Sequence, residues 1–285
     1  MNSKPENTVR RTFLKSAFAT AAAMAVPSGS LRANSFSRNS LQVWSCGGLA
    51  EAFMPANVRY EQQTGIKISY TGAFAAALGK SLLGSAVTEI FGGRVLDLAK
   101  KLKSSGKMLY FKPLCFTSYV MITPLANPAG IEKIADLARP GVRVILAPEA
   151  SPPGGQAVQI LLKKAGILDS VSKNCVLSGS CVQRTMDDII SGKGDVSVVE
   201  LRLTKMVGFA GKTTVIPIPE EFFPPPPLTF TIGVMKDAAD RVLADHYVQY
   251  ITSEEGQAFF ATAGFIPAIS EKGRELIEKL GVKDV

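Results

Sequence analysis

The stretch from residue 41 to residue 70 reads LQVWSCGGLAEAFMPANVRYEQQTGIKISY. It opens with a short apolar run, Leu41 to Ser45, that is typical of a β-strand, and it continues with a helical pattern from Ala50 to Gln63. A second strand-like run follows from Lys67 to Tyr70. A strand, a helix and a strand in this order form one βα unit, which favours a parallel pair of strands with the helix on one face.

The same alternation continues along the rest of the chain. Further strands are expected at 89–91, 143–146, 196–199 and 229–234, with one more starting at Val176, and further helices are expected at 74–83, 94–103, 155–165 and around 186–190. Repeated βα units predict a mostly parallel sheet with helices on both faces.

Two extended connections interrupt this alternation. The first is the β-rich stretch 116–123, which lies between Pro113 and Pro124, and the second is the run of prolines at 224–227. The predicted fold class is therefore α/β, with two doubly wound lobes joined by a two-strand hinge. Lobe I is predicted to comprise 41–121 plus 228–285, and lobe II 122–227.

The N-terminus resembles a twin-arginine export leader. Arg10 and Arg11 precede a Phe-Leu-Lys run, an uncharged alanine-rich stretch covers Ser16 to Val26, and Ala33 lies near a plausible cleavage site. The apolar stretch is too short to span a membrane. Residues 1–33 are thus predicted to be a signal peptide read by the twin-arginine translocase, and the mature protein is expected in the periplasm.

Composition excludes several classes of function. Removal of the leader lowers the formal net charge from +8 to about +4, so a basic surface for nucleic acid is not indicated. His246 is the single histidine of the chain and falls in a helical pattern, which disfavours a Ser-His-Asp triad or a histidine-rich zinc site. We expect a non-enzymatic monomer without a cofactor.

Between 41 and 269 the chain resembles the periplasmic solute-binding proteins of ABC importers, and within them the molybdate and tungstate branch. The segments that carry this resemblance are 46–53, 61–65, 147–157, 182–199 and 253–265. The most specific is Ser-Glu-Glu-Gly-Gln-Ala-Phe-Phe at 253–260, followed by Gly264 and Phe265.

The resemblance implies a type II binding-protein fold whose two lobes close on a ligand without breaking a bond. It implies a small oxyanion of the molybdate or tungstate kind as the ligand and a membrane-bound ABC permease as the partner. A sensor that presents its closed form to a membrane receptor is an alternative that the sequence cannot separate from transport.

Four loops are expected to face the ligand, since loops after strands and helix N-termini meet at the cleft of such a fold. Small residues in these loops let the backbone approach an anion closely. Ordinary glycine-rich βα turns would look the same for each loop taken alone. The predicted ligand-binding residues are Ser45, Cys46, Gly47, Gly48, Thr71, Gly72, Ala73, Pro153, Gly154, Gly155, Cys181, Val182 and Glu200.

The chain departs from the molybdate pattern in its hydroxyl donors. The serines of the family fall at Gly48 and near Ala73, and its tyrosine falls at Glu200. A carboxylate in this place repels an oxyanion unless it is protonated or paired, for which Arg202 and Arg184 are the candidates.

The four cysteines allow three interpretations. In an oxidising compartment the first is one or two disulfides, such as Cys175 with Cys181 or Cys46 with Cys181. The second is a site for a soft metal or thiophilic ligand built from Cys46, Cys115 and Cys181, with Glu200 as a further candidate, so that a metal ion would replace the oxyanion as ligand. The third is free, buried thiols that act as small apolar residues. A catalytic thiol is disfavoured, because no histidine accompanies it.

Overall fold

A computed structural model of the chain describes residues 36–150, 154–223 and 229–284. Ser35–Val285 forms one compact unit, separate from Met1–Asn34. The predicted leader therefore lies outside the described residues. Within the described part of the chain, no helix combines the length and the apolar character that a membrane crossing requires.

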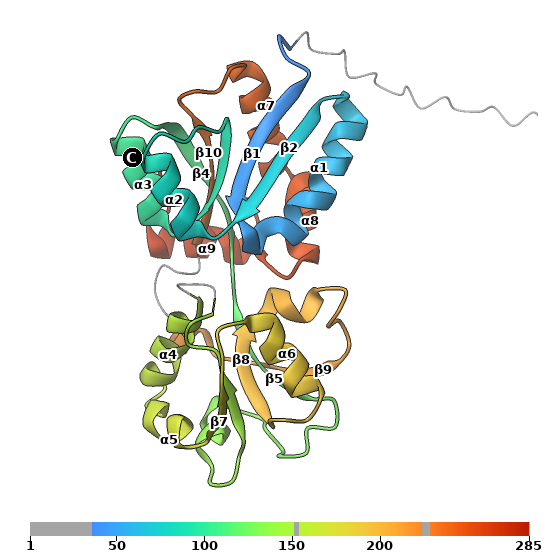
Figure 1. Ribbon diagram of the computed structural model, residues 1–285, viewed down its shortest axis with the longest axis vertical. Coiled ribbons are helices and arrows are strands. Elements are labelled where there is room, and N and C mark those ends of the chain that lie inside the picture. The colour runs from blue at the N-terminus through green and yellow to red at the C-terminus, as the bar shows by residue number, and fades with distance from the viewer. Residues whose placement is uncertain (1–35, 151–153, 224–228, 285) are drawn as a thin grey trace, which may run out of the picture. The chain divides into compact units, whose positions relative to one another are not determined.

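The first of two sheets has six strands in the order β11-β4-β10-β3-β1-β2 (Figure 1). Its strands are β1 (Ser40–Cys46), β2 (Lys67–Ala73), β3 (Ile90–Arg94), β4 (Met108–Phe116), β10 (Thr229–Met235) and β11 (Ile266–Pro267). β1 pairs in parallel with β2 and β3, whereas β10 is antiparallel to β3 and β4, and β11 is antiparallel to β4.

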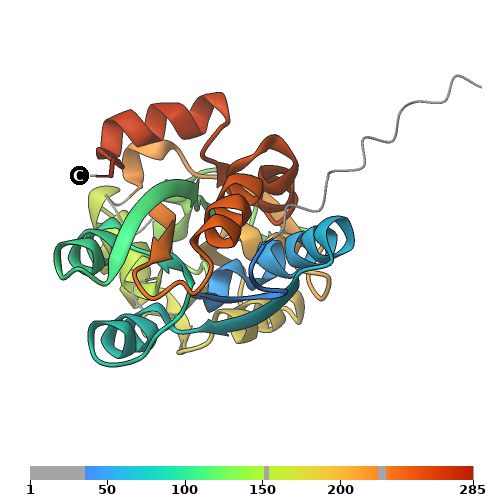
Figure 2. The same cartoon turned by 90° about the horizontal axis from the view of Figure 1, so that it is seen from above.

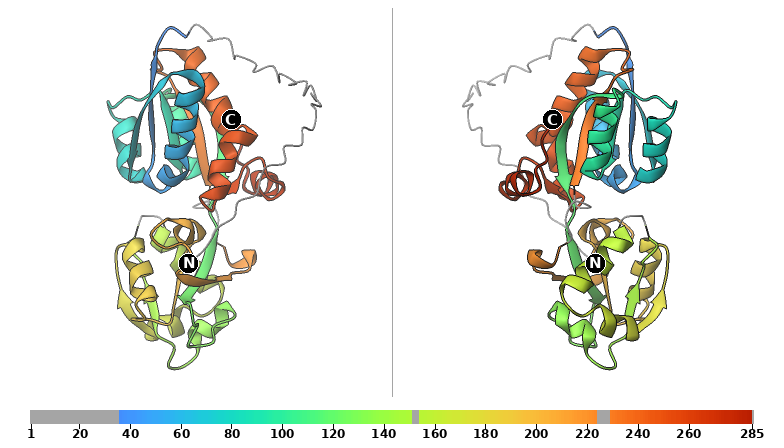
Figure 3. Two further views of the ribbon diagram at one scale, coloured as in Figure 1. Left: turned by 90° about the vertical axis from the view of Figure 1, so that its right-hand side faces the viewer. Right: turned by 90° about the vertical axis from the view of Figure 1, so that its left-hand side faces the viewer.

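The second sheet has five strands in the order β7-β6-β8-β5-β9. Its strands are β5 (Tyr119–Pro124), β6 (Val144–Leu146), β7 (Cys175–Ser178), β8 (Val196–Glu200) and β9 (Thr213–Pro217). The chain passes from β4 of the first sheet directly into β5 of the second (Figure 3).

Both sheets are mixed, which corrects the expectation of mostly parallel sheets. β5 is antiparallel to β8 and β9, while β6 is parallel to β7 and β8. All antiparallel pairs among the described strands except that of β11 with β4 involve β5 or β10, the strands with which the chain enters each sheet from the other one. Pairing within the second sheet begins at Tyr119, two residues before the predicted end of lobe I at residue 121; the lobe bounds themselves stay a prediction.

Helices cover both faces of each sheet, as a doubly wound fold requires. Figure 2 shows helices on both sides of the strands of the first sheet. The helices of the described residues are α1 (Ala50–Thr64), α2 (Ala75–Leu83), α3 (Leu96–Ser104), α4 (Gly154–Lys164), α5 (Leu168–Lys173), α6 (Val182–Ile190), α7 (Arg241–Thr252), α8 (Glu254–Thr262) and α9 (Glu271–Leu280). Short 3-10 helices η1 (Gly47–Leu49), η2 (Ile134–Ala138), η3 (Leu201–Lys205) and η4 (Glu220–Phe222) complete the set.

The core of the first sheet shows why its central strands β3 and β10 are buried on both faces. Successive residues of a strand point to opposite faces, so Ile90 packs into the cluster with α1, α7 and α8, while Phe91 packs into the cluster with α2, α3 and α9. All residues of β3, β8 and β10 are buried. The second sheet is covered in the same way, by α4 and α5 on one face and α6 on the other.

The segment 253–260, which carries much of the family resemblance, becomes α8 and the cap before it. Ser253 accepts a hydrogen bond from the backbone N–H of Gly256 and so caps the helix. A Cβ at Gly256 would collide with the backbone of Tyr250 and Ile251. The buried Gln257 of α8 donates to the carbonyl of Ile251 in α7 and accepts from the N–H of Ala268, which follows β11. Its side chain therefore links α8 to α7 and to the segment after β11.

Candidate functional site

Three strands of the first sheet end at the same edge. Ser45 near the end of β1 lies opposite Gly72 of β2 on one side and Gly92 of β3 on the other. In open α/β sheets, ligands bind outside the carboxyl ends of the strands. Gly92 allows close packing here, because a Cβ in its place would lie 3.0 Å from the ring of Phe53 and 3.2 Å from the Cβ of Ser45.

Arg94, the last residue of β3, forms a buried ion pair with Glu200, the last residue of β8 in the second sheet. The Nη2 of Arg94 donates to Oε1 of Glu200 at 2.5 Å, and the Nε of Arg202 donates to Oε2 at 2.6 Å. The side chains of Arg94, Glu200 and Arg202 are 3%, 5% and 7% exposed, respectively. Each oxygen of one carboxylate thus accepts from a different guanidinium, away from water.

The charge state of Glu200 follows from these partners. Burial alone would raise the pKa of its carboxyl group, but the positive charges and hydrogen bonds of Arg94 and Arg202 outweigh burial and lower the pKa to about 2. Glu200 is therefore ionised at neutral pH. A second carboxylate, Glu51 of α1, lies 3.8 Å from Nη1 of Arg202 and is 31% exposed.

A small pocket lies beside the two guanidinium groups. Its volume is about 60 Å³, and its lining residues are Cys46, Gly47, Gly48, Ala73, Phe74, Ala75, Arg94 and Arg202. Helix α2 starts at this pocket with Phe74 as its N-cap, and no side chain caps it. The uncapped N–H groups of a first turn carry partial positive charge, so the pocket combines backbone donors with two buried cations.

A second small pocket is lined in part by Glu200. Its lining residues are Tyr119, Ala147, Gly154, Gly155, Val158, Val182, Thr185, Val198, Val199 and Glu200. Helices α4 and α6 begin at this pocket, and Tyr119 lies directly opposite Glu200 in the ladder between β5 and β8. Burial raises the pKa of the Tyr119 hydroxyl, which stays protonated at neutral pH.

The predicted site residues divide into three groups. Those at the first pocket are Cys46, Gly47, Gly48 and Ala73, and those at the second are Gly154, Gly155, Val182 and Glu200. Those that line neither pocket are Ser45, which hydrogen-bonds to the hydroxyl of Tyr70, and the exposed residues Thr71, Gly72 and Cys181. Pro153 lies outside the described residues.

Arg94 was missed by the sequence prediction, which placed it at the start of a helix. The structure places it at the end of β3, two residues before α3 begins. The available signal was the order of residues at 90–94, where an apolar pair and two glycines precede a charged residue, as at a strand end that faces a site. Arg184, a predicted partner of Glu200, instead pairs with Asp188 on its own helix.

The cysteine predictions need correction. Cys46, Cys115, Cys175 and Cys181 are all free thiols, so neither predicted disulfide is formed. Cys46 and Cys115 are buried in the core of the first sheet, whereas Cys181 is exposed at the start of α6.

The proposed metal site is not assembled either. In the part of the chain that the structure covers, no group of three or more His, Cys, Asp or Glu side chains is placed to hold a metal ion. Burial also raises the pKa of the Cys46 and Cys115 thiols, which favours the thiol over the metal-binding thiolate.

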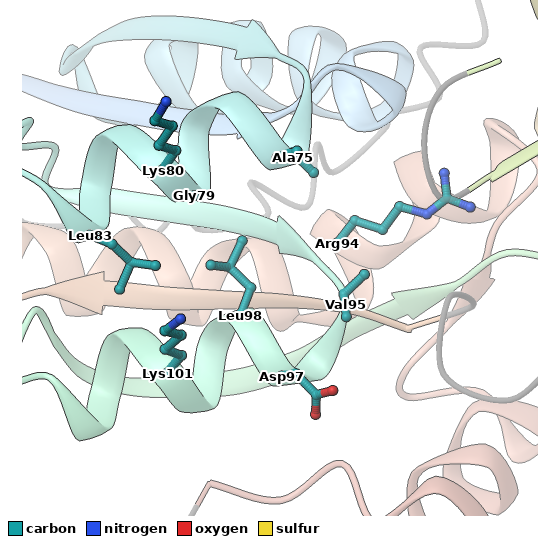
Figure 4. A pocket seen from close by; sticks show the side chains of 10 residues that line it. Ala75, Gly79, Lys80, Leu83, Arg94, Val95, Asp97, Leu98 and Lys101 are labelled. Carbon is teal, nitrogen blue, oxygen red and sulfur yellow. The ribbon is translucent and has the colours of Figure 1, made fainter. Parts of the chain in front are cut away.

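A larger groove lies between α2 and α3 (Figure 4). Its volume is about 690 Å³, and it is lined mainly by apolar groups of Ala75, Gly79, Leu83, Val95 and Leu98. The guanidinium of Arg94 extends away from the lysines of this groove in Figure 4. Arg94 lines both this groove and the arginine-lined pocket, but its partner cation Arg202 lines only the pocket. The arginine-lined pocket is therefore the stronger candidate for a charged ligand.

Two kinds of comparison place the chain among known proteins. The molybdate-binding protein ModA of Mycobacterium tuberculosis H37Rv is 24% identical over 230 residues, which cover 79% of this chain and 84% of that protein. The periplasmic molybdate-binding protein of Azotobacter vinelandii has a TM-score of 0.65 at 17% identity, covering 79% of this chain and 98% of that structure. The sulfate-binding protein SubI of M. tuberculosis has a TM-score of 0.61 at 18% identity, covering 85% and 92%.

These relatives are binding proteins, and at such identities the solved structures establish the shared fold. The sequence profile described as bacterial extracellular solute-binding protein matches residues 41–266, from the second residue of β1 to the start of β11. That range includes all or part of every described strand, the arginine-lined pocket and the second pocket. The chain therefore belongs to the bacterial extracellular solute-binding proteins.

Proposed function

We propose that this solute-binding protein holds a small oxyanion, similar in size and shape to molybdate or tungstate, beside Arg94 and Arg202 and delivers it to an ABC permease. The observation that carries the proposal is the pocket of about 60 Å³ at which two buried guanidinium groups meet the uncapped start of α2. Guanidinium groups and free backbone N–H groups are both suited to oxyanions. The names of the molybdate-binding and sulfate-binding relatives support the same ligand class.

The pocket differs in chemistry from the one that the sequence predicted. The prediction relied on loops of small residues and on hydroxyl donors, whereas the structure adds charged donors from β3 and η3. Gly48 retains a role in this arrangement, because a Cβ at its position would lie 3.3 Å from the Arg202 guanidinium and would press on it. Glycine at 48 therefore favours the observed placement of that side chain.

Thermal shift and titration calorimetry on the purified protein test this proposal. Molybdate, tungstate, sulfate, phosphate and singly charged tetrahedral oxyanions form the panel. An anion present at a hundred times its Kd should stabilise the protein by about 2.7 kcal/mol. Arg202→Gln should weaken binding of that anion by at least about tenfold, through the loss of a charged donor. A protein that none of these anions stabilises would not be an oxyanion-binding protein.

The route of export and the state of assembly are part of the same proposal. The Arg10-Arg11 leader supports export by the twin-arginine translocase into the periplasm, where the mature protein would act as a monomer. The family to which the chain belongs is extracellular, which agrees with export by some route.

A further inference from the structure

The charges around the arginine-lined pocket do not match a doubly charged ligand. Within the structurally described residues, the buried charges that meet here are Arg94, Arg202 and Glu200, because each guanidinium is paired with one carboxylate oxygen of Glu200. Two positive charges and one negative charge leave a surplus of one positive charge. Glu51, which is 31% exposed and lies 3.8 Å from Nη1 of Arg202, offsets part of this remaining positive charge.

Glu200 is fixed in this position. Its carboxylate is 5% exposed, both of its oxygens accept short hydrogen bonds, and its backbone is paired with Tyr119 in the middle of the second sheet. A ligand therefore meets the guanidinium groups with the carboxylate already between them. A doubly charged anion would add more uncompensated negative charge at low dielectric than a singly charged one, because Glu200 and Glu51 already offset much of the charge of the two guanidinium groups.

We propose that Glu200 is a specificity-determining residue that selects singly charged over doubly charged oxyanions at the Arg94–Arg202 pocket. This inference rests on the proposed anion-binding function and names the ligand class within it. The carboxylate acts as a permanent second anion of the site, so that discrimination depends on charge even when two ligands have the same shape.

The volume of the pocket limits the size of such an ion. About 60 Å³ is room for a few water molecules. A compact oxyanion with few heavy atoms is of the right scale, and a sugar or a peptide is not. Size alone cannot separate tetrahedral oxyanions of similar radius, so charge is the property that remains for discrimination.

Matched pairs of tetrahedral oxyanions separate charge from shape. Perrhenate and tungstate are close in size but carry one and two negative charges, and perchlorate and sulfate form a second such pair. Titration calorimetry of the wild-type protein should give tighter binding of perrhenate than of tungstate and of perchlorate than of sulfate. Tighter binding of the doubly charged member of both pairs would overturn the inference, and this measurement requires no variant.

Glu200→Gln then tests the residue itself. The amide keeps the size of the side chain but removes its charge, which leaves two positive charges in the buried cluster. The ratio of tungstate to perrhenate affinity should rise by at least about tenfold, because unit charges a few ångströms apart interact strongly enough for such a change. Glu200→Asp, which keeps the charge, should retain the wild-type preference for the singly charged ion.

A control variant shows whether the position of the charge matters. Glu255 of α8 pairs with Arg59 at the surface and lines neither pocket, so Glu255→Gln changes the net charge by the same amount and should leave the affinity ratio unchanged. An equal rise of the ratio in Glu255→Gln and Glu200→Gln would overturn the inference. Circular dichroism on each variant confirms that it is folded.

The outcomes also separate this inference from the proposed function. Anion binding that depends on Arg202, but whose preference does not change in Glu200→Gln, would leave the proposed function standing and refute the role of Glu200. Failure of every anion to bind the wild-type protein would refute the proposed function, and the charge selection with it.

Discussion

At the scale of single residues, the negative charge of Glu200 contributes to the stability of the fold. Its carboxylate stabilises two guanidinium groups that are themselves buried. Removing one partner of a buried charge cluster leaves the others uncompensated, which commonly costs about 3–5 kcal/mol. The same group that shapes the pocket is therefore also one of the most sensitive positions for folding.

We expect Glu200→Ala to lower the free energy of unfolding by about 3–5 kcal/mol at neutral pH. The loss arises because Arg94 and Arg202 keep their charges but lose a buried counter-ion. Urea denaturation followed by circular dichroism measures the change. Glu255→Ala, at a surface ion pair, serves as the control and should cost no more than about 1 kcal/mol.

The pH dependence of this effect has a definite sign. The pKa of Glu200 is lowered to about 2 in the folded protein, so its contribution is present above the pKa of the unfolded chain, about 4.3, and disappears as the pH falls toward 2. The stability difference between wild type and Glu200→Ala should therefore shrink over that interval. A difference that stays constant from neutral pH down to this range would contradict the lowered pKa.

At the scale of elements, the first turn of α4 depends on close backbone packing. A Cβ at Gly155 would collide with the carbonyl oxygens of Ala147 and Pro148, and no rotation of a side chain can relieve that contact. Gly155→Ala should lower the stability by about 1–3 kcal/mol, as measured by urea denaturation. Gly208→Ala is the matched control, because no atom lies within 4 Å of a Cβ there; equal losses in both variants would refute the packing argument.

Elements within the βα units were predictable, because they depend on local periodicity. The helix expected from Ala50 to Gln63 is observed as Ala50–Thr64, and the strand expected at 196–199 as Val196–Glu200. The strand Met108–Phe116 was not predicted, and Arg94 was assigned to the wrong element. Both errors concern the region where the chain leaves regular βα alternation, so periodicity gave little information about it.

The candidate site was predictable only in part, for a related reason. The loop 46–48 and Glu200 could be identified from glycines, small residues and the family pattern, and Arg202 lies two positions from the carboxylate that it pairs with. Arg94 lies 106 positions away from Glu200. This contact exists only after both sheets have formed. The residue pattern of a single segment therefore cannot predict it.

At the scale of the whole molecule, the predicted leader allows a test of the export route. Replacement of Arg10 and Arg11 by lysine should keep the protein in the cytoplasm, because the translocase that we propose reads the arginine pair. Cell fractionation followed by immunoblotting measures the distribution. The control is the mature domain from residue 34 behind an unrelated Sec leader, which should still be exported. Unchanged export of the lysine variant would show that another route is used.

The pairing of Glu200 with both guanidinium groups also bears on how fast a bound anion leaves. A binding site whose buried cations lose their only counter-ion on release has a high-energy empty state, and its ligand dissociates slowly. Here the carboxylate stays behind when the anion departs, so each guanidinium still has a partner. If the protein binds an anion as proposed, the residence time of that anion is expected to be shorter as a result, which would suit the proposed delivery to a permease.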